Sequence, residues 1–204
     1  MTPDMLPWIL ARATGMTAIV LIGGAMIAGL MVRTRTTVGG LKGSGMVDLH
    51  RHLSLLGLMA IAAHGVFLVL DTAVDISPLA LVVPGLVPYR PLWTGIGVVA
   101  AESALLVHLS FRFRGRIGVP MWRRLHLLTY AVFAGGVVHG IGSGTDTGST
   151  WAMAVYGGLV GAVCGLTGWR AMTARRPTKK ARDASSSRQN RPMGDTVKSR
   201  QAVS

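Results

Sequence analysis

Four of the six histidines in this chain form two pairs within apolar stretches of sequence. His50 and His64 are fourteen residues apart, and His126 and His139 are thirteen apart. An imidazole is costly to place in lipid, so a histidine in a membrane span is expected to face a bundle interior, where it usually has a function. Neutral imidazole is also a common metal ligand. The two pairs therefore predict two helices that hold flat metal cofactors at two depths of a bilayer.

Helix geometry favours one face for the first pair. At about 100° and about 1.5 Å per residue, fourteen residues bring His50 and His64 within about 40° of alignment and about 21 Å apart along the axis. That distance is most of a hydrocarbon core of about 30 Å. The rival partner of His64 is His52, which lies about 120° off this face. The spacing therefore favours His50.

The second pair is less regular. Thirteen residues leave His126 and His139 about 140° from alignment in an ideal helix. Gly135 and Gly136 lie between them, and a helix distortion there would bring the rings closer to one face. Without a distortion, the two rings must be reached from different sides of the helix.

Depth in the membrane pairs the histidines across the two helices. Both helices are expected to begin at the same side of the bilayer, which puts His50 level with His126 and His64 level with His139. Each level then offers two axial ligands to one haem. Two imidazoles fill both axial positions of the iron, which favours electron transfer over oxygen binding.

Basic and small residues near these levels suit the same interpretation. Arg51 and Arg124 lie near the inner level and are candidates to pair with haem propionates, although a role in topology alone is the alternative. Glycines are expected to leave room for a macrocycle, although small residues are also common at helix contacts; these are Gly57, Gly65, Gly136 and Gly140.

The composition is that of a membrane protein. Half of the 204 residues are hydrophobic and the mean hydropathy is +0.47, which leaves too few charges to cover a soluble fold. The net charge is +13, and it is explained better by membrane topology and anionic lipid than by nucleic acid. The single cysteine, Cys164, excludes an intramolecular disulfide, a thiolate-held iron–sulfur cluster and a four-cysteine zinc site.

Five apolar runs are long enough to cross the hydrocarbon as helices, which needs about 20 residues. They predict an all-α integral membrane bundle of five transmembrane helices, at about 13–32, 50–70, 92–111, 121–141 and 151–169. The proline-rich stretch between the second and third runs is expected to be an ordered outer loop rather than a sixth helix. We expect a haem-binding transmembrane domain over 1–172 and a basic, disordered cytoplasmic tail over 173–204.

The loop charges predict the orientation. Arginine and lysine concentrate after the first, third and fifth runs, which fall on one side of a five-span bundle. Because cytoplasmic loops carry the excess of positive charge, we expect the N-terminus outside and the C-terminus in the cytoplasm.

Three further polar residues have open roles. Glu102 lies in the middle of the third run, where an acid is expected to be neutral or paired inside the bundle. It is either a proton site or a residue that hydrogen-bonds to a cofactor-binding histidine, or it is simply a satisfied hydrogen-bonding group inside the bundle. His52 and His108 are expected to be ordinary hydrogen-bonding residues near the interface.

Two motifs carry a resemblance to a known family. One is Leu49-His50-Arg51-His52-Leu53 through Ala63-His64, and the other is Trp122-Arg123-Arg124-Leu125-His126-Leu127-Leu128-Thr129-Tyr130 through Val138-His139. Together, over about residues 8–172, they resemble the ferric reductase-like transmembrane family. That family includes ferric reductases, the membrane core of NADPH oxidases and the haem-binding subunit of the bacterial methionine sulfoxide reductase system.

The resemblance implies a helical bundle that binds b-type haem, with His50 and His126 on an inner haem and His64 and His139 on an outer one. The oxidase-type members of the family place one histidine pair fourteen residues apart and one pair thirteen residues apart on parallel helices. The likeness to the sulfoxide reductase subunit leaves open whether the chain binds two haems or one.

We therefore expect a haem b cytochrome of a bacterial plasma membrane, an oxidoreductase component that carries electrons across the membrane. It would lack its own flavin or NADPH domain. Its expected partners are membrane lipid, a separate donor (a flavoprotein or quinone) and an external acceptor (ferric iron or a reductase), with no nucleic acid. The alternatives are a haem-bearing anchor for a separate reductase and a cofactor-free proton or metal transporter or assembly subunit.

Overall fold

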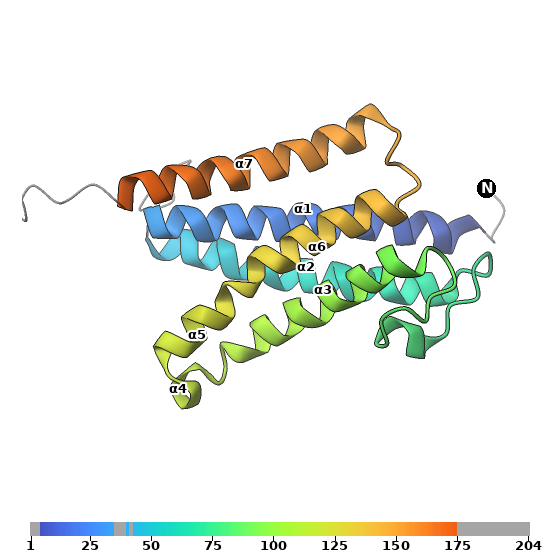
Figure 1. Ribbon diagram of the computed structural model, residues 1–204, viewed down its shortest axis with the longest axis horizontal. Coiled ribbons are helices and arrows are strands. Elements are labelled where there is room, and N and C mark those ends of the chain that lie inside the picture. The colour runs from blue at the N-terminus through green and yellow to red at the C-terminus, as the bar shows by residue number, and fades with distance from the viewer. Residues whose placement is uncertain (1–4, 35–39, 41–42, 175–204) are drawn as a thin grey trace, which may run out of the picture. The chain divides into compact units, whose positions relative to one another are not determined.

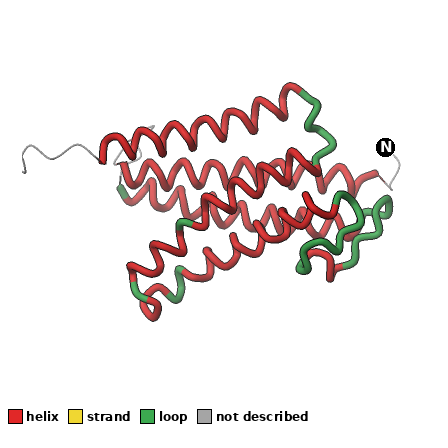
Figure 2. The backbone as a smooth tube through the Cα atoms, viewed as in Figure 1, coloured by secondary structure: helices red, strands yellow, loops and turns green. Residues whose placement is uncertain are grey.

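The computed structural model describes residues 5–34, 40 and 43–174, and all regular structure within them is helical (Figures 1 and 2). The helices are α1 (Leu6–Thr34), α2 (Ser44–Leu70), the 3₁₀ helix η2 (Pro78–Leu81), α3 (Pro91–Ser110), α4 (Arg114–Ile117), α5 (Val119–His126), α6 (Leu128–Ser143) and α7 (Thr150–Ala174). The tail predicted over 173–204 lies, from residue 175 onward, outside the described residues.

Five stretches are long and apolar enough to cross a membrane, as the sequence predicts. They are Leu6–Arg33, Ser44–Leu70, Pro91–Ser110, Val119–Ser143 and Thr150–Thr173. The first begins seven residues earlier than the apolar run at 13–32, and the fourth contains both α5 and α6. This arrangement fits a multi-pass membrane protein.

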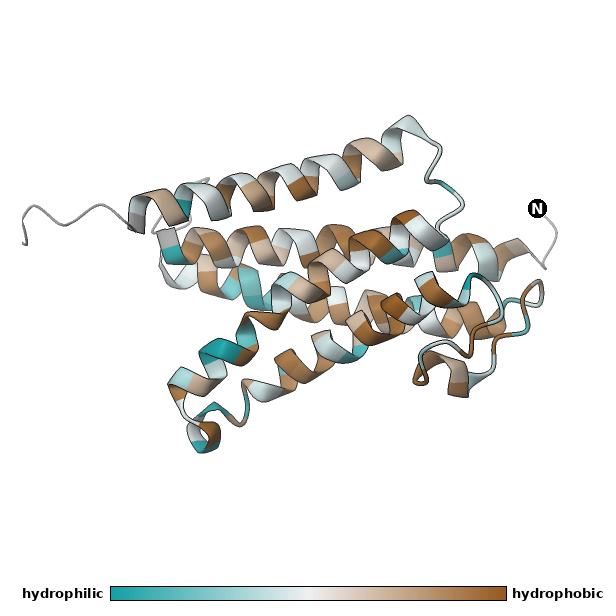
Figure 3. Ribbon diagram, in the orientation of Figure 1, coloured by the Kyte–Doolittle hydropathy of each residue, from teal (hydrophilic) through white to brown (hydrophobic). Residues whose placement is uncertain are grey.

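The outer surfaces of these helices are apolar (Figure 3). Met59 of α2, Leu92 and Leu106 of α3 are each more than half exposed. Soluble proteins rarely expose large side chains in continuous patches, whereas lipid accepts them. Most of the helix surface is therefore suited to contact with hydrocarbon.

The two most closely packed pairs of helices are α1 with α2 and α3 with α6. Gly57 of α2 lies where a Cβ atom would come within 2.7 Å of the end of the Ile22 side chain of α1, so the absence of a side chain at Gly57 lets the two helices lie close together. Ile19 of α1 and Phe133 and Val137 of α6 belong to one buried cluster. α1 therefore packs against α2, which carries His50 and His64, and against α6, which carries His139.

The connection between α2 and α3 is ordered, and η2 is its only helical turn, as its prolines predict. Ser77 caps η2 by accepting a hydrogen bond from the Ala80 amide. Ile76, Ala80 and Val87 form a small buried cluster of their own. The loop thus closes over the end of the bundle at which α3 begins.

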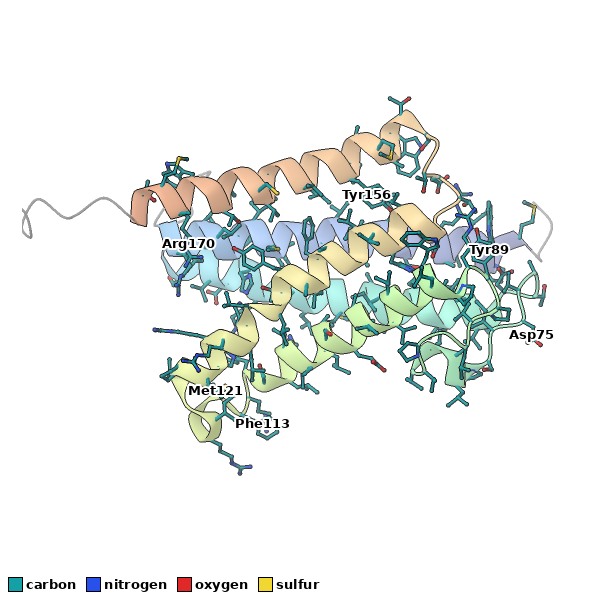
Figure 4. The ribbon with its side chains drawn as sticks, in the orientation of Figure 1. Asp75, Tyr89, Phe113, Met121, Tyr156 and Arg170 are labelled. Carbon is teal, nitrogen blue, oxygen red and sulfur yellow. The ribbon has the colours of Figure 1, made fainter. Side chains whose placement is uncertain are left out.

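Two compact units are distinguished, Met1–Leu166 and Thr167–Ser204. Within the first unit, Met121 and Phe113 lie at one end of the helices and Tyr89 and Asp75 at the other (Figure 4). Arg12 of α1 is ion-paired with Asp146 at the Tyr89 end, with its Nε donating over 2.9 Å. This pair ties α1 to the connection between α6 and α7.

Candidate functional site

The four paired histidines meet across the bundle at two levels. The ring centroids of His50 and His126 are 6.1 Å apart, and those of His64 and His139 are 6.3 Å apart. His52 points elsewhere, because its side chain is exposed and its Nδ1 bonds the Asp48 carbonyl of its own helix. The structure thus places His50, rather than His52, in register with the second helix.

Both separations suit one metal atom between two imidazoles. A metal–nitrogen bond of about 2.0 Å and about 1.1 Å from nitrogen to ring centroid put two opposed centroids about 6 Å apart. The ring planes are inclined by 73° at one level and 76° at the other. Two axial imidazoles can take such crossed planes, since each ring rotates about its own bond to the metal.

Backbone carbonyls of α1 hold the two histidines of α2. His50 Nδ1 lies 2.7 Å from the Ala25 oxygen, and His64 Nδ1 lies 2.7 Å from the Ala11 oxygen. A carbonyl only accepts, so the proton must be on Nδ1 and the lone pair on Nε2. Ala11 and Ala25 are fourteen residues apart, as His50 and His64 are. The antiparallel helices therefore repeat the same contact at both levels.

His139 of α6 is held in the same way by α3. His139 Nδ1 donates to the Trp93 carbonyl over 2.9 Å. This bond again fixes the Nε2 atom as the basic nitrogen. A hydrogen bond from the second ring nitrogen to a carbonyl is the usual support of a metal-bound histidine, because it sets the tautomer, orients the ring and raises its basicity.

A glycine follows each of these three carbonyls by four residues. A Cβ atom on Gly15 would come within 3.0 Å of the His64 ring, and one on Gly29 within 3.2 Å of the His50 ring. A Cβ atom on Gly97 would overlap the ring of His139. In a helix the residue at i+4 lies beside the carbonyl of residue i. The glycines therefore open the carbonyls to the imidazoles.

The fourth histidine, His126, ends α5 just before a break in the helix. The chain leaves α-helical geometry at Leu127, whose amide bonds the Arg124 carbonyl and whose carbonyl accepts from the Tyr130 amide. The hydroxyl of Thr129 donates to the His126 carbonyl over 2.8 Å. Such 3₁₀-type turns rotate by about 120° per residue, which adds rotation in the direction that the thirteen-residue spacing lacks. The distortion thus lies at Leu127, and not at Gly135 and Gly136 as the sequence suggests.

The indole of Trp122 supports His126 where no carbonyl does. Its ring lies 5.1 Å from the imidazole, nearly parallel at 29°. Within the described residues, neither ring nitrogen of His126 makes a hydrogen bond. The level of His50 and His126 therefore has one carbonyl-bound imidazole and one stacked imidazole, and the level of His64 and His139 has two carbonyl-bound ones.

The donor set at each level suits a metal that brings its own equatorial ligands. Among the described residues, no group of three or more His, Cys, Asp or Glu side chains is close enough to hold an ion. Two neutral nitrogens are too few for a bare tetrahedral metal. They would be enough to complete the coordination of an iron that a porphyrin already holds. The residues present thus fit haem.

The two predicted arginines both lie on the exposed surface of the helices. Arg51 is exposed and forms a loose pair with Asp48 at 3.8 Å, and Arg124 is exposed at the surface of α5. A cation that the sequence reasoning missed, Arg33 at the end of α1, is near enough to His126 to act on it electrostatically.

Glu102 lies on the exposed face of α3. The expectation that it is paired inside the bundle is therefore wrong, because α3 turns its opposite side, at Ile96 and Ala100, toward Gly135 of α6. His108 is also exposed, in the last turn of α3. Neither residue takes part in the two histidine levels.

The glycines singled out from the sequence pack against other side chains. A Cβ atom on Gly65 would meet Leu81, one on Gly136 would meet Ile19, and one on Gly140 would meet Tyr156, which reaches from α7 toward α6 (Figure 4). Gly15 and Gly29, which were not singled out from the sequence, lie instead against the imidazole rings of His64 and His50. Their fourteen-residue spacing, equal to that of the α2 histidines, was the available signal.

No family model, curated protein or solved structure matches this chain. The function is therefore inferred from the residues themselves and their geometry.

Proposed function

We propose that this protein is a b-type haem cytochrome of the ferric reductase-like type, which carries electrons across a membrane through two haems. The observation that supports it most is the repeated pairing of imidazoles at 6.1 and 6.3 Å. Three of the four rings have Nδ1 bound to a helix carbonyl, which leaves Nε2 for a metal. Haem iron, when bound, accepts and gives up one electron at a time.

The chain's own residues determine which chemistry is available. With a histidine from each helix as ligand, a bound haem iron would have no open position for oxygen or substrate and would be suited to electron transfer alone. The surrounding helices exclude water, and about 21 Å along α2 separates His50 from His64. Phe133, which is 5% exposed, lies on α6 between His126 and His139 in sequence. Apolar side chains between the two levels would keep the reorganisation energy of electron transfer small.

The proposal extends to orientation and partners. The basic ends of the spans suit a cytoplasmic side, which puts His50 and His126 at the inner level and the N-terminus outside, in a bacterial plasma membrane. A flavoprotein or quinone would supply electrons, and ferric iron or a reductase would receive them on the outer side. If the acceptor is a bound reductase, the protein is its haem-bearing anchor.

Haem content per chain tests this function. Protein purified from membranes in mild detergent is expected to contain two haems by the pyridine haemochrome assay, with the sharp bands of reduced low-spin haem. His64→Ala or His139→Ala should leave one. His52→Ala is the matched control and should leave two. A colourless wild-type protein that binds Zn²⁺ would instead favour the transporter, and equal haem content in all variants would exclude these ligands.

A further inference from the structure

Two buried polar side-chain atoms in the described part of the chain lack a hydrogen-bond partner. They are Trp122 Nε1 and Ser143 Oγ. Leaving a buried donor without a partner costs about 1–3 kcal/mol, and native proteins rarely accept that cost. An acceptor from another molecule is therefore expected at each position.

The positions of these atoms relate them to the two histidine levels. Trp122 precedes His126 by four residues, and Ser143 follows His139 by four residues. Four residues are about one helical turn, or about 6 Å along the axis. Each unpaired atom thus lies one turn from a histidine, on the side away from the middle of the bundle and toward the nearer end of the helices.

The chemistry of the two atoms narrows the kind of partner. An indole N–H only donates, and a serine hydroxyl can donate, so one type of acceptor satisfies both. A cation lies near the second site, because Arg90 donates to the carbonyl of Gly142, next to Ser143, over 2.6 Å. A buried donor beside a cation favours an anionic oxygen.

We infer that Trp122 and Ser143 bind the propionate carboxylates of the inner and the outer haem, respectively. The inference rests on the proposed function. Haem b carries its propionates along one edge of the macrocycle, and a charged edge is most stable when it points toward the nearer membrane surface. The donors lie on that side of both levels. Trp122 stacks on its histidine, so one side chain orients the ligand and binds the anionic edge.

Comparing protohaem with its dimethyl ester tests the inference, because the ester keeps the macrocycle and removes the charge. Each level is measured alone, the inner in a His64→Ala background and the outer in a His50→Ala background. The apoproteins are titrated in detergent and dissociation constants are obtained from the absorption bands. The ester is expected to bind about 10- to 100-fold more weakly, as for the loss of hydrogen bonds to a charged group.

Variants assign the preference to the two side chains. Trp122→Phe keeps the stacked ring and should weaken protohaem binding about tenfold, with little change for the ester. Trp151→Phe, at an exposed indole on α7, is the matched control and should change neither. Ser143→Ala should likewise weaken protohaem binding at the outer level, with little change for the ester. Ser143→Thr should restore the preference for protohaem over the ester.

The outcomes separate this inference from the function on which it rests. Equal affinities for protohaem and the ester in the parent chains would overturn the inference and leave the haem assignment intact. A Trp122→Phe variant that loses affinity for protohaem and for the ester by the same factor would also overturn the inference. A purely structural role of Trp122 would weaken the binding of both compounds equally. Failure of the wild-type chain to bind any haem would overturn both.

Discussion

The glycine at position 97 offers the sharpest test of how the outer histidine is held. Gly97→Ala would place a methyl group where the His139 ring now lies. The ring must move, and its Nδ1 bond to the Trp93 carbonyl is then lost or lengthened. Loss of such a support typically costs a metal site 10- to 100-fold in affinity, which is about 1.4–2.7 kcal/mol.

Helix propensity predicts a change of the opposite sign. Glycine inside a helix is about 1 kcal/mol less favourable than alanine. If only the backbone mattered, Gly97→Ala would stabilise the protein. Gly161→Ala in α7 is the matched control, because no atom lies within 4 Å of a Cβ there. The control is expected to be neutral or slightly stabilising, with two haems retained.

Titration of apoprotein with haem measures the difference directly. The outer dissociation constant of Gly97→Ala should rise about 10- to 100-fold while the inner one changes little. The thermal midpoint of the two apoproteins shows whether the bundle itself is affected. Equal outer dissociation constants in Gly97→Ala and Gly161→Ala would refute the view that this glycine gives the imidazole access to the carbonyl.

Other perturbations test neighbouring parts of the structure. Gly15→Ala should weaken the outer haem and Gly29→Ala the inner one, each about 10- to 100-fold, and a variant that weakens the opposite level would contradict the assignment. Thr129→Val removes the hydroxyl that donates to the His126 carbonyl and should lower stability to denaturant by about 1 kcal/mol. Glu102→Gln should leave haem content and spectrum unchanged, because Glu102 is exposed; loss of a haem would place it nearer the histidines. Redox titration should resolve two components with different midpoint potentials, and the component of lower potential should be lost in His64→Ala. A single component would argue against two unequal levels.

The sequence predicts the five spans because bilayer thickness itself sets their length. About 20 apolar residues at 1.5 Å per residue cross the hydrocarbon, whatever the helices pack against. Counting residues from the same membrane side likewise predicts that His50 lies level with His126. Both predictions depend on distance along a single helix, which the sequence contains directly.

The break at Leu127 was not predictable from composition. Glycine and proline are the usual signs of a distorted helix, and Gly135 and Gly136 drew the prediction to the wrong place. The signal was instead Thr129, whose hydroxyl competes for a backbone carbonyl three residues earlier. Threonine makes this bond in many regular helices, so its presence alone does not mark a break.

Contacts between helices were the least predictable. Gly15 and Gly29 matter only because α1 lies antiparallel against the histidine face of α2, and nothing in α1 alone shows which face that is. The misplacement of Glu102 has the same origin. Glu102 does lie near the middle of α3, but the face on which it lies depends on where α3 packs against α6.

The two levels are built from the same residue type but are not equivalent. At the level of His64 and His139 both rings donate to carbonyls, which would make both more electron-rich as ligands and favour ferric iron. At the level of His50 and His126 only His50 does so, so ferric iron would be favoured less there. This difference would put the level of His50 and His126 at the higher potential. An electron moving outward would then go uphill between the levels, and an external acceptor would have to draw it onward. The bonds around the imidazoles would thus set the difference in potential between the levels, whereas the donor and the acceptor would set the direction of flow.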